Sequence, residues 1–94
     1  MINLIKKRCG ISENVKIYDN DIEMYIKDCI QDMISSGVSK TIAESEEDAA
    51  VLTAITLYVS AYLGIDRTDT EKYLDLYRKK VFRLTLEGDK IVEQ

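Results

Sequence analysis

The chain has 94 residues, the length of one domain, and a domain of this size buries only about 60–65% of the surface that it exposes when unfolded. It is 46% hydrophobic and 32% charged with no proline, which argues against a disordered chain, a membrane protein and an all-β sandwich or barrel. The absence of histidine and the net charge of −4 argue against most general-base catalysis and against general nucleic-acid binding.

A short first helix is predicted over residues 3–9. Asn3 can cap its start, and Gly10 can supply the left-handed residue that ends it. The basic run at residues 6–8 follows too short an apolar stretch for a secretory signal, so no such signal is expected.

A second helix is predicted to begin at Asp19 or Asn20 and to end at residues 35–37. Met24 falls on its wet face, opposite the apolar stripe. That stripe has the i, i+3, i+4 spacing of a helix and consists of Ile22, Tyr25, Ile26, Cys29, Ile30 and Met33.

After a polar loop at residues 37–44, a third helix is predicted to run to Gly64. Ser45 and Asp48 form an S-x-x-D pattern typical of a capping box at its start. Residues 49–63 are apolar on nearly all sides, so this helix is expected either to be central or to face another subunit in part. The apolar stretch is shorter than the roughly 20 residues of a membrane span, and no membrane association is expected.

A fourth helix is predicted after a second capping box, Thr68 with Glu71. Its core face consists of Tyr73, Leu74, Tyr77, Val81 and Leu84. Leu76 and Phe82 lie off this stripe, and the basic residues on the far side are Lys72, Lys79 and Arg83. The pattern stops at Glu87. The sequence therefore predicts an all-α fold, a small bundle of about four helices at residues 1–86, with the apolar third helix central and a flexible C-terminal tail at residues 87–94.

The charge is unevenly spread along the chain. Residues 1–18 carry +3, residues 19–37 carry −4, residues 38–64 carry −3, and residues 65–94 sum to zero. Two interpretations are open: head-to-tail complementarity between copies, or ordinary solvated helix faces.

No pattern typical of an enzyme is present, because there is no glycine-rich phosphate loop, no G-x-S-x-G, no C-x-x-C and no histidine to activate a nucleophile. We expect no enzymatic activity, no cofactor and no metal. The acidic run at residues 44–48 is better explained by the charge preference of a helix start than by a cation site. Cys9 and Cys29 are expected to be reduced, buried thiols, with a disulfide as the alternative.

The order of these elements resembles the small head-tail connector (adaptor) proteins of long-tailed bacteriophages and prophages, the DNA-packaging connector group. The resemblance covers roughly residues 3–86. Its closest matches are Asp21-Ile22, Ala54 with Leu57 and Tyr58, and Leu76-Tyr77-Arg78. Family members often have a proline before the third helix and before the Tyr-Arg pair, where this chain has Glu46-Glu47 and Leu76.

The resemblance implies a homo-oligomeric ring of about a dozen copies at the head-tail junction of the virion, assembled in the host bacterial cytoplasm. Its partners would be the portal protein and a tail-completion or stopper protein, and DNA would pass through the channel without sequence-specific binding. The residues expected at the interfaces are Met24, Lys72, Lys79, Phe82, Arg83 and Leu86. A small helical regulatory or nucleic-acid-binding protein is the alternative.

Overall fold

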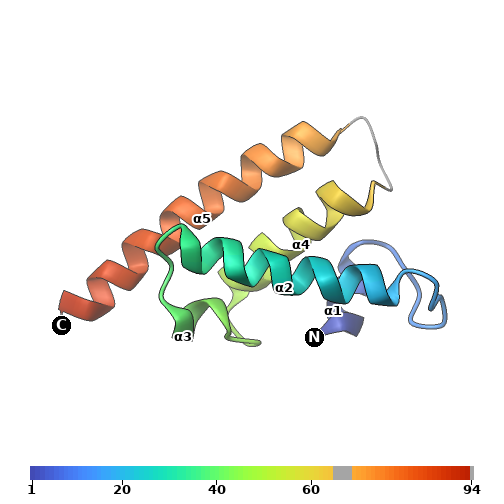
Figure 1. Cartoon of the computed structure of the whole chain (residues 1–94), viewed down its shortest axis with the longest axis horizontal. Coiled ribbons are helices and arrows are strands. Elements are labelled where there is room, and N and C mark those ends of the chain that lie inside the picture. The colour runs from blue at the N-terminus through green and yellow to red at the C-terminus, as the bar shows by residue number, and fades with distance from the viewer. Residues whose placement is uncertain (65–68, 94) are drawn as a thin grey trace.

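The computed structural model describes the backbone of residues 1–64 and 69–93 and the side chains of residues 1–64 and 69–86. Within this part of the chain there are five helices and no strand. They are α1 (Ile2–Arg8), α2 (Asp19–Ser35), α3 (Lys40–Ala43), α4 (Ala49–Leu63) and α5 (Thr70–Glu93), shown in chain order in Figure 1. The all-α bundle predicted from the sequence is confirmed.

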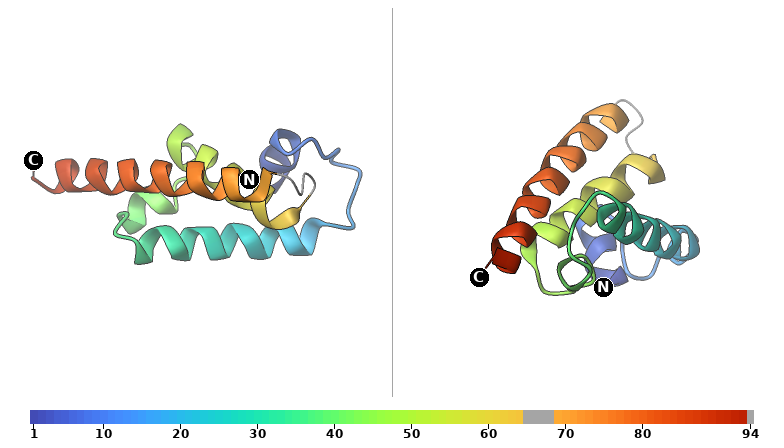
Figure 2. Two further views of the ribbon diagram at one scale, coloured as in Figure 1. Left: turned by 90° about the horizontal axis from the view of Figure 1, so that it is seen from above. Right: turned by 60° about the vertical axis from the view of Figure 1, so that its left-hand side comes forward.

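The α4 helix is the centre of the bundle. It packs against α5 on one side and α2 on the other, and it also contacts α1. The two views of Figure 2 show α4 between α2 and α5, with the C-terminal part of α5 extending beyond the other helices. The molecule is accordingly elongated, with extents of 44 × 25 × 18 Å.

The core is built from the apolar stripes that the sequence predicts. The most deeply buried residues of α4 are Val51, Ala54, Ile55 and Val59, and they meet Ile22, Cys29 and Met33 of α2 and Leu84 of α5. Four tyrosines extend this packing across all three long helices. The ring of Tyr58 lies 4.6 Å from that of Tyr62 and 5.1 Å from that of Tyr77, and Tyr62 reaches Tyr25 at 5.9 Å.

The start of α4 differs from the predicted capping box. Asp48, not Ser45, is the N-cap, and its carboxylate accepts the backbone N–H groups of Ala50 at 2.9 Å and Val51 at 3.1 Å. The Ser45 hydroxyl accepts the N–H of Asp48 itself, so it orders the turn before the helix. At the other end Gly64 has φ of +70°, the left-handed conformation that ends α4 as predicted.

Three further boundaries differ from the sequence-based expectations. α1 begins at Ile2 with Met1 as its N-cap, so Asn3 lies inside the helix and does not cap it, and no side chain caps its start. Part of the predicted polar loop forms the single turn α3, and Ala43 of this turn belongs to the same buried core as Val38. Thr68, the predicted cap of the last helix, lies outside the described residues. The division between a domain at 1–86 and a tail at 87–94 stays a prediction, although the backbone of α5 is helical to Glu93.

Candidate functional site

The exposed side of α5 carries five of the six residues predicted at interfaces. Lys72, Lys79, Phe82, Arg83 and Leu86 are all exposed there, with Phe82 64% and Leu86 46% accessible. Residues 79, 82, 83 and 86 follow the i, i+3, i+4, i+7 spacing of one helix face. Met24 is exposed as predicted, but it lies on α2, and the structure does not bring it together with the residues on α5.

We call the surface formed by Arg78, Lys79, Phe82, Arg83 and Leu86 the α5 ridge. These residues line a shallow hollow of about 480 Å³. Residues 76–86 contain four basic side chains and no acidic one. The α5 ridge therefore combines uncovered apolar side chains with positive charge. The exposed ion pair of Lys79 with Asp75, 3.0 Å long, changes this little, because such pairs are weak in water.

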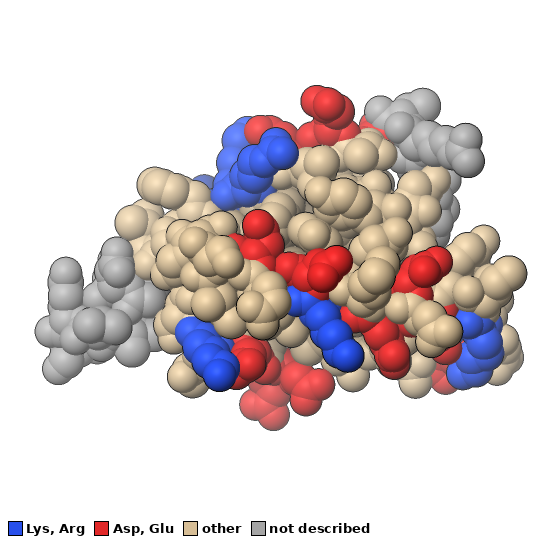
Figure 3. Space-filling model, in the orientation of Figure 1, with Lys and Arg blue, Asp and Glu red and all other residues tan. Residues whose placement is uncertain are grey.

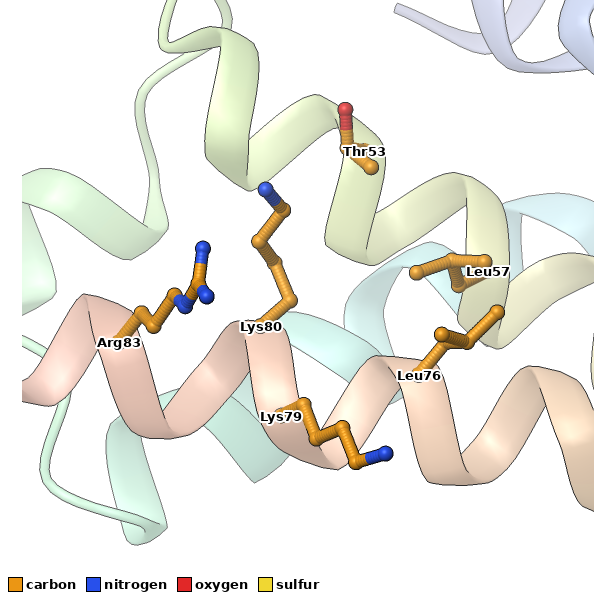
Figure 4. A pocket seen from close by; sticks show the side chains of 6 residues that line it. All are labelled: Thr53, Leu57, Leu76, Lys79, Lys80 and Arg83. Carbon is orange, nitrogen blue, oxygen red and sulfur yellow. The ribbon is translucent and has the colours of Figure 1, made fainter.

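A second hollow, of about 410 Å³, separates the inner edge of this surface from α4. Leu57 of α4 and Leu76 of α5 approach each other at one end, as Figure 4 shows. Lys80 and Arg83 extend from α5 toward α4 near Thr53, whereas Lys79 points away. The basic side chains of α5 thus lie on both sides of its exposed apolar residues.

A surface of opposite charge lies across α1, α2 and the turn after α3. A groove of about 570 Å³ has an apolar floor formed by Met1, Ile2, Ile26 and Ile30. Its rim carries three carboxylates and one ammonium group, those of Glu23, Glu44, Glu46 and Lys27. We call this the α1–α2 groove. Figure 3 shows acidic side chains spread over α2 and the region below it. Sequence reasoning missed this groove, because its lining comes from three separate segments.

Lys6 is the other feature that sequence reasoning missed. Its side chain is 0% exposed, although it belongs to a run of three basic residues, a residue type that is usually exposed to solvent. The ammonium group donates to the carbonyl oxygens of Glu13 at 3.2 Å and Val15 at 2.6 Å, and to the carboxylate of Asp19 at 2.7 Å. These three acceptors satisfy all three of its donors and fix the loop between α1 and α2.

The two cysteines are free thiols without the properties of a nucleophile. Burial raises the pKa of Cys29 from 9.0 to about 12, and burial also raises the pKa of Cys9. Cys29 donates weakly to the Tyr77 hydroxyl at 3.8 Å, and Tyr77 donates to the Asp32 carboxylate at 2.6 Å. Burial, followed by that bond to Asp32, raises the pKa of Tyr77. The Cys29 thiol and the Tyr77 hydroxyl therefore stay protonated at neutral pH, and Tyr77 links α5 to Asp32 of α2 by a hydrogen bond.

The acidic run at residues 44–48 is divided between two structural positions. Asp48 caps α4, whereas Glu44 and Glu46 line the α1–α2 groove. Across the described residues, no three His, Cys, Asp or Glu side chains converge as metal ligands would. None of the helices in that same part of the chain has the length and apolar character needed to cross a membrane.

Comparison with known protein families gives the family of the chain. The family model of the phage connector protein matches residues 1–90, nearly the whole chain. The chain belongs to the phage connector protein family. No curated protein and no solved structure matches this connector.

Family membership gives the connector a structural role in the phage virion, at the joint between head and tail. Contacts with other virion proteins are central to such a role, so exposed apolar and charged surfaces are where its function is to be sought. The α5 ridge and the α1–α2 groove are the two surfaces of this kind described above.

Proposed function

We propose that the connector assembles into a ring of identical subunits at the head-tail junction. The ring would join the portal protein to a tail-completion or stopper protein, and DNA would pass through its centre without sequence-specific contacts. Family membership supports the location, and the exposed surfaces of the protomer support the assembly. Residues 1–86 would form the connector domain in this arrangement, and residues 87–94 would form a tail.

The observation that carries this proposal is the exposure of Phe82. An aromatic ring that is 64% exposed on an ordered helix, next to the exposed Leu86, gains little from the fold of its own protomer. Aromatic and arginine side chains are enriched in protein interfaces, and Phe82 lies between Arg78 and Arg83. Phe82, Leu86, Arg83, Lys79, Lys72 and Met24 are accordingly the proposed contact residues.

The experiment that tests the ring is a measurement of mass and shape. The purified chain is examined by light scattering over a range of concentrations, alone and with added portal protein, and by negative-stain electron microscopy. We expect annular particles whose mass is a multiple of the protomer mass. A constant monomer or dimer in every mixture would overturn the proposal, and retardation of duplex DNA by that species would favour the regulatory or nucleic-acid-binding alternative.

A further inference from the structure

The α5 ridge and the α1–α2 groove are complementary in both apolar character and charge. The α5 ridge presents Phe82 and Leu86 between basic side chains. The α1–α2 groove offers an apolar floor that includes Ile2 and Ile30, bordered mainly by carboxylates. An exposed apolar surface with a positive border and an apolar groove with a negative border meet the two requirements of a specific interface, burial at the centre and complementary charge at the rim.

The two surfaces belong to different elements of the protomer. The α5 ridge lies on α5, whereas the groove is formed by α1, α2 and the turn after α3, and α4 lies between α5 and α2 (Figure 2). A contact between two different surfaces of identical chains is heterologous, and repetition of such a contact gives a closed ring or an open filament.

We propose that the α5 ridge of one copy docks in the α1–α2 groove of the next copy. This inference rests on the proposed function, and it specifies the subunit contact that builds the ring. Phe82 and Leu86 cover the apolar floor near Ile30, while Arg78 and Arg83 face Glu23 and Glu46. This contact buries Phe82 and Leu86, which the isolated protomer leaves exposed.

The composition of the α5 ridge favours a second copy over DNA as its occupant. A surface that binds the phosphate groups of duplex DNA needs basic side chains. Exposed apolar side chains such as Phe82 and Leu86 would add nothing to that binding, because the bases of a duplex are stacked inside it. The α1–α2 groove is bordered by Glu23, Glu44 and Glu46, which would repel phosphate and attract the α5 ridge. Each surface is therefore complementary to the other surface on a second copy of the chain.

A test with two variants, one altered in the α5 ridge and one in the α1–α2 groove, distinguishes this contact from a contact in which both copies use the same surface. The ridge variant carries Phe82→Ser and Arg83→Ser, and the groove variant carries Glu23→Lys and Glu46→Lys, so the two altered surfaces do not regain opposite charges when the variants are mixed. All four positions are exposed, so both variants should fold, as checked by thermal unfolding. Assembly is compared under the conditions in which the unmodified chain forms rings, alone or on the portal protein.

We expect self-association of either variant to weaken roughly 10- to 100-fold, because each has lost one of the two surfaces. An equimolar mixture should form a 1:1 dimer that grows no further, since the intact groove of the ridge variant accepts the intact ridge of the groove variant. Asp21→Lys is the matched control for Glu23→Lys. It reverses an exposed charge on α2 on the side of the helix away from the groove, and rings should persist.

The outcomes distinguish this inference from the proposed function. If the unmodified chain never forms rings, the proposed function fails and the docking fails with it. Rings that persist in both variants would overturn the docking alone, and so would a mixture that stays monomeric. Should a double variant fail to fold, the single changes Phe82→Ser and Glu23→Lys take its place in the same mixing experiment. Assembly of the unmodified chain should also weaken as salt is raised, whereas a ridge that faces DNA in the channel would leave assembly intact.

Discussion

Lys6 shows how a single side chain can determine the path of a loop. A lysine ammonium group removed from water is costly unless it is paired and fully hydrogen-bonded, and here two carbonyl oxygens and a carboxylate satisfy it. Two of these acceptors, from Glu13 and Val15, belong to the loop between α1 and α2, and the third, Asp19, begins α2. Hydrogen bonds from Lys6 therefore hold the loop against α1. The side chains of Val15 and Ile17 are exposed and contribute little apolar packing to hold the loop in place.

We predict that Lys6→Met lowers the free energy of unfolding by about 2–3 kcal/mol. Methionine fills the same space but leaves Asp19 and two carbonyl groups without their donor, and the partial exposure of Asp19 to water moderates the loss. Chemical denaturation followed by circular dichroism measures the change. Lys7→Met, at an exposed position of the same helix, should change stability by less than about 0.5 kcal/mol. Equal effects of the two substitutions would contradict the structural role of Lys6.

Because of Cys29, the free energy of unfolding of the connector decreases as the pH rises through the alkaline range. The pKa of Cys29 rises from 9.0 in an exposed thiol to about 12 in the fold, so between these values the folded chain binds more protons than the unfolded chain. The stabilisation is complete below pH 9 and is lost as the pH rises toward 12. Cys9 acts in the same direction, and so do Tyr58 and Tyr77 at pH values above about 10, where an exposed tyrosine ionises.

We expect the free energy of unfolding to fall by about 1 kcal/mol between pH 8 and pH 10 on account of Cys29. Urea titrations in the presence of a reductant measure the fall at each pH. Cys29→Ala lowers stability at every pH because it leaves a small cavity, but it should also reduce the slope with pH. A slope identical to that of the unmodified chain would show that the thiol ionises equally in both states.

At the scale of elements, α4 organises the fold because its neighbours bury it on several sides. The sequence predicts this helix well, since fifteen residues with few polar interruptions lie between a capping residue and Gly64. The single turn α3 has no such signal. Its four residues are helical because Ala43 packs into the core and Ile42 packs against it, and no local pattern encodes that packing. The burial of Lys6 was likewise unpredictable, because its acceptors come from positions seven to thirteen residues later.

Ile55→Asp is expected to abolish cooperative folding. Ile55 is fully buried in α4, and an unpaired carboxylate at that position costs more than a small domain can lose. Thermal unfolding followed by circular dichroism should show no sigmoidal transition. The matched control is Ile17→Asp, the same substitution at an isoleucine that is 80% exposed, which should leave the transition in place. A cooperative transition at an unchanged temperature in Ile55→Asp would show that α4 is not the structural centre.

At the scale of the whole molecule, the two surfaces differ in how far the sequence reveals them. The α5 ridge is visible in the sequence because Phe82 lies off a well-defined apolar stripe, and one helix carries all of its residues. The α1–α2 groove requires the fold, which brings Ile2, Ile30 and Glu46 together from three segments. Sequence periodicity predicts which face of a helix is exposed, but it does not predict which exposed faces become neighbours.

We predict that Phe82→Ser combined with truncation after Leu84 gives a chain that folds but fails to join heads to tails. Phe82 and Leu86 contribute little to the core, so the unfolding temperature should stay within about 4 °C of that of the unmodified chain. Complementation of a phage that lacks the connector measures joining. Ile17→Ser, which removes an exposed apolar side chain outside both surfaces, should support normal joining. Unfolding of the free double variant would instead assign Phe82 to the core.

The enclosure of Lys6 also determines how the connector reacts with amine-directed chemistry. Acylating reagents need a free, deprotonated amine, and the Lys6 nitrogen is surrounded by its three acceptors with no solvent contact. The exposed Lys7 and Lys16 should be modified within minutes, whereas Lys6 should react only when α1 separates from the following loop. Mass spectrometry of labelled peptides would then report the opening of this one segment, in the free chain and in the assembled particle.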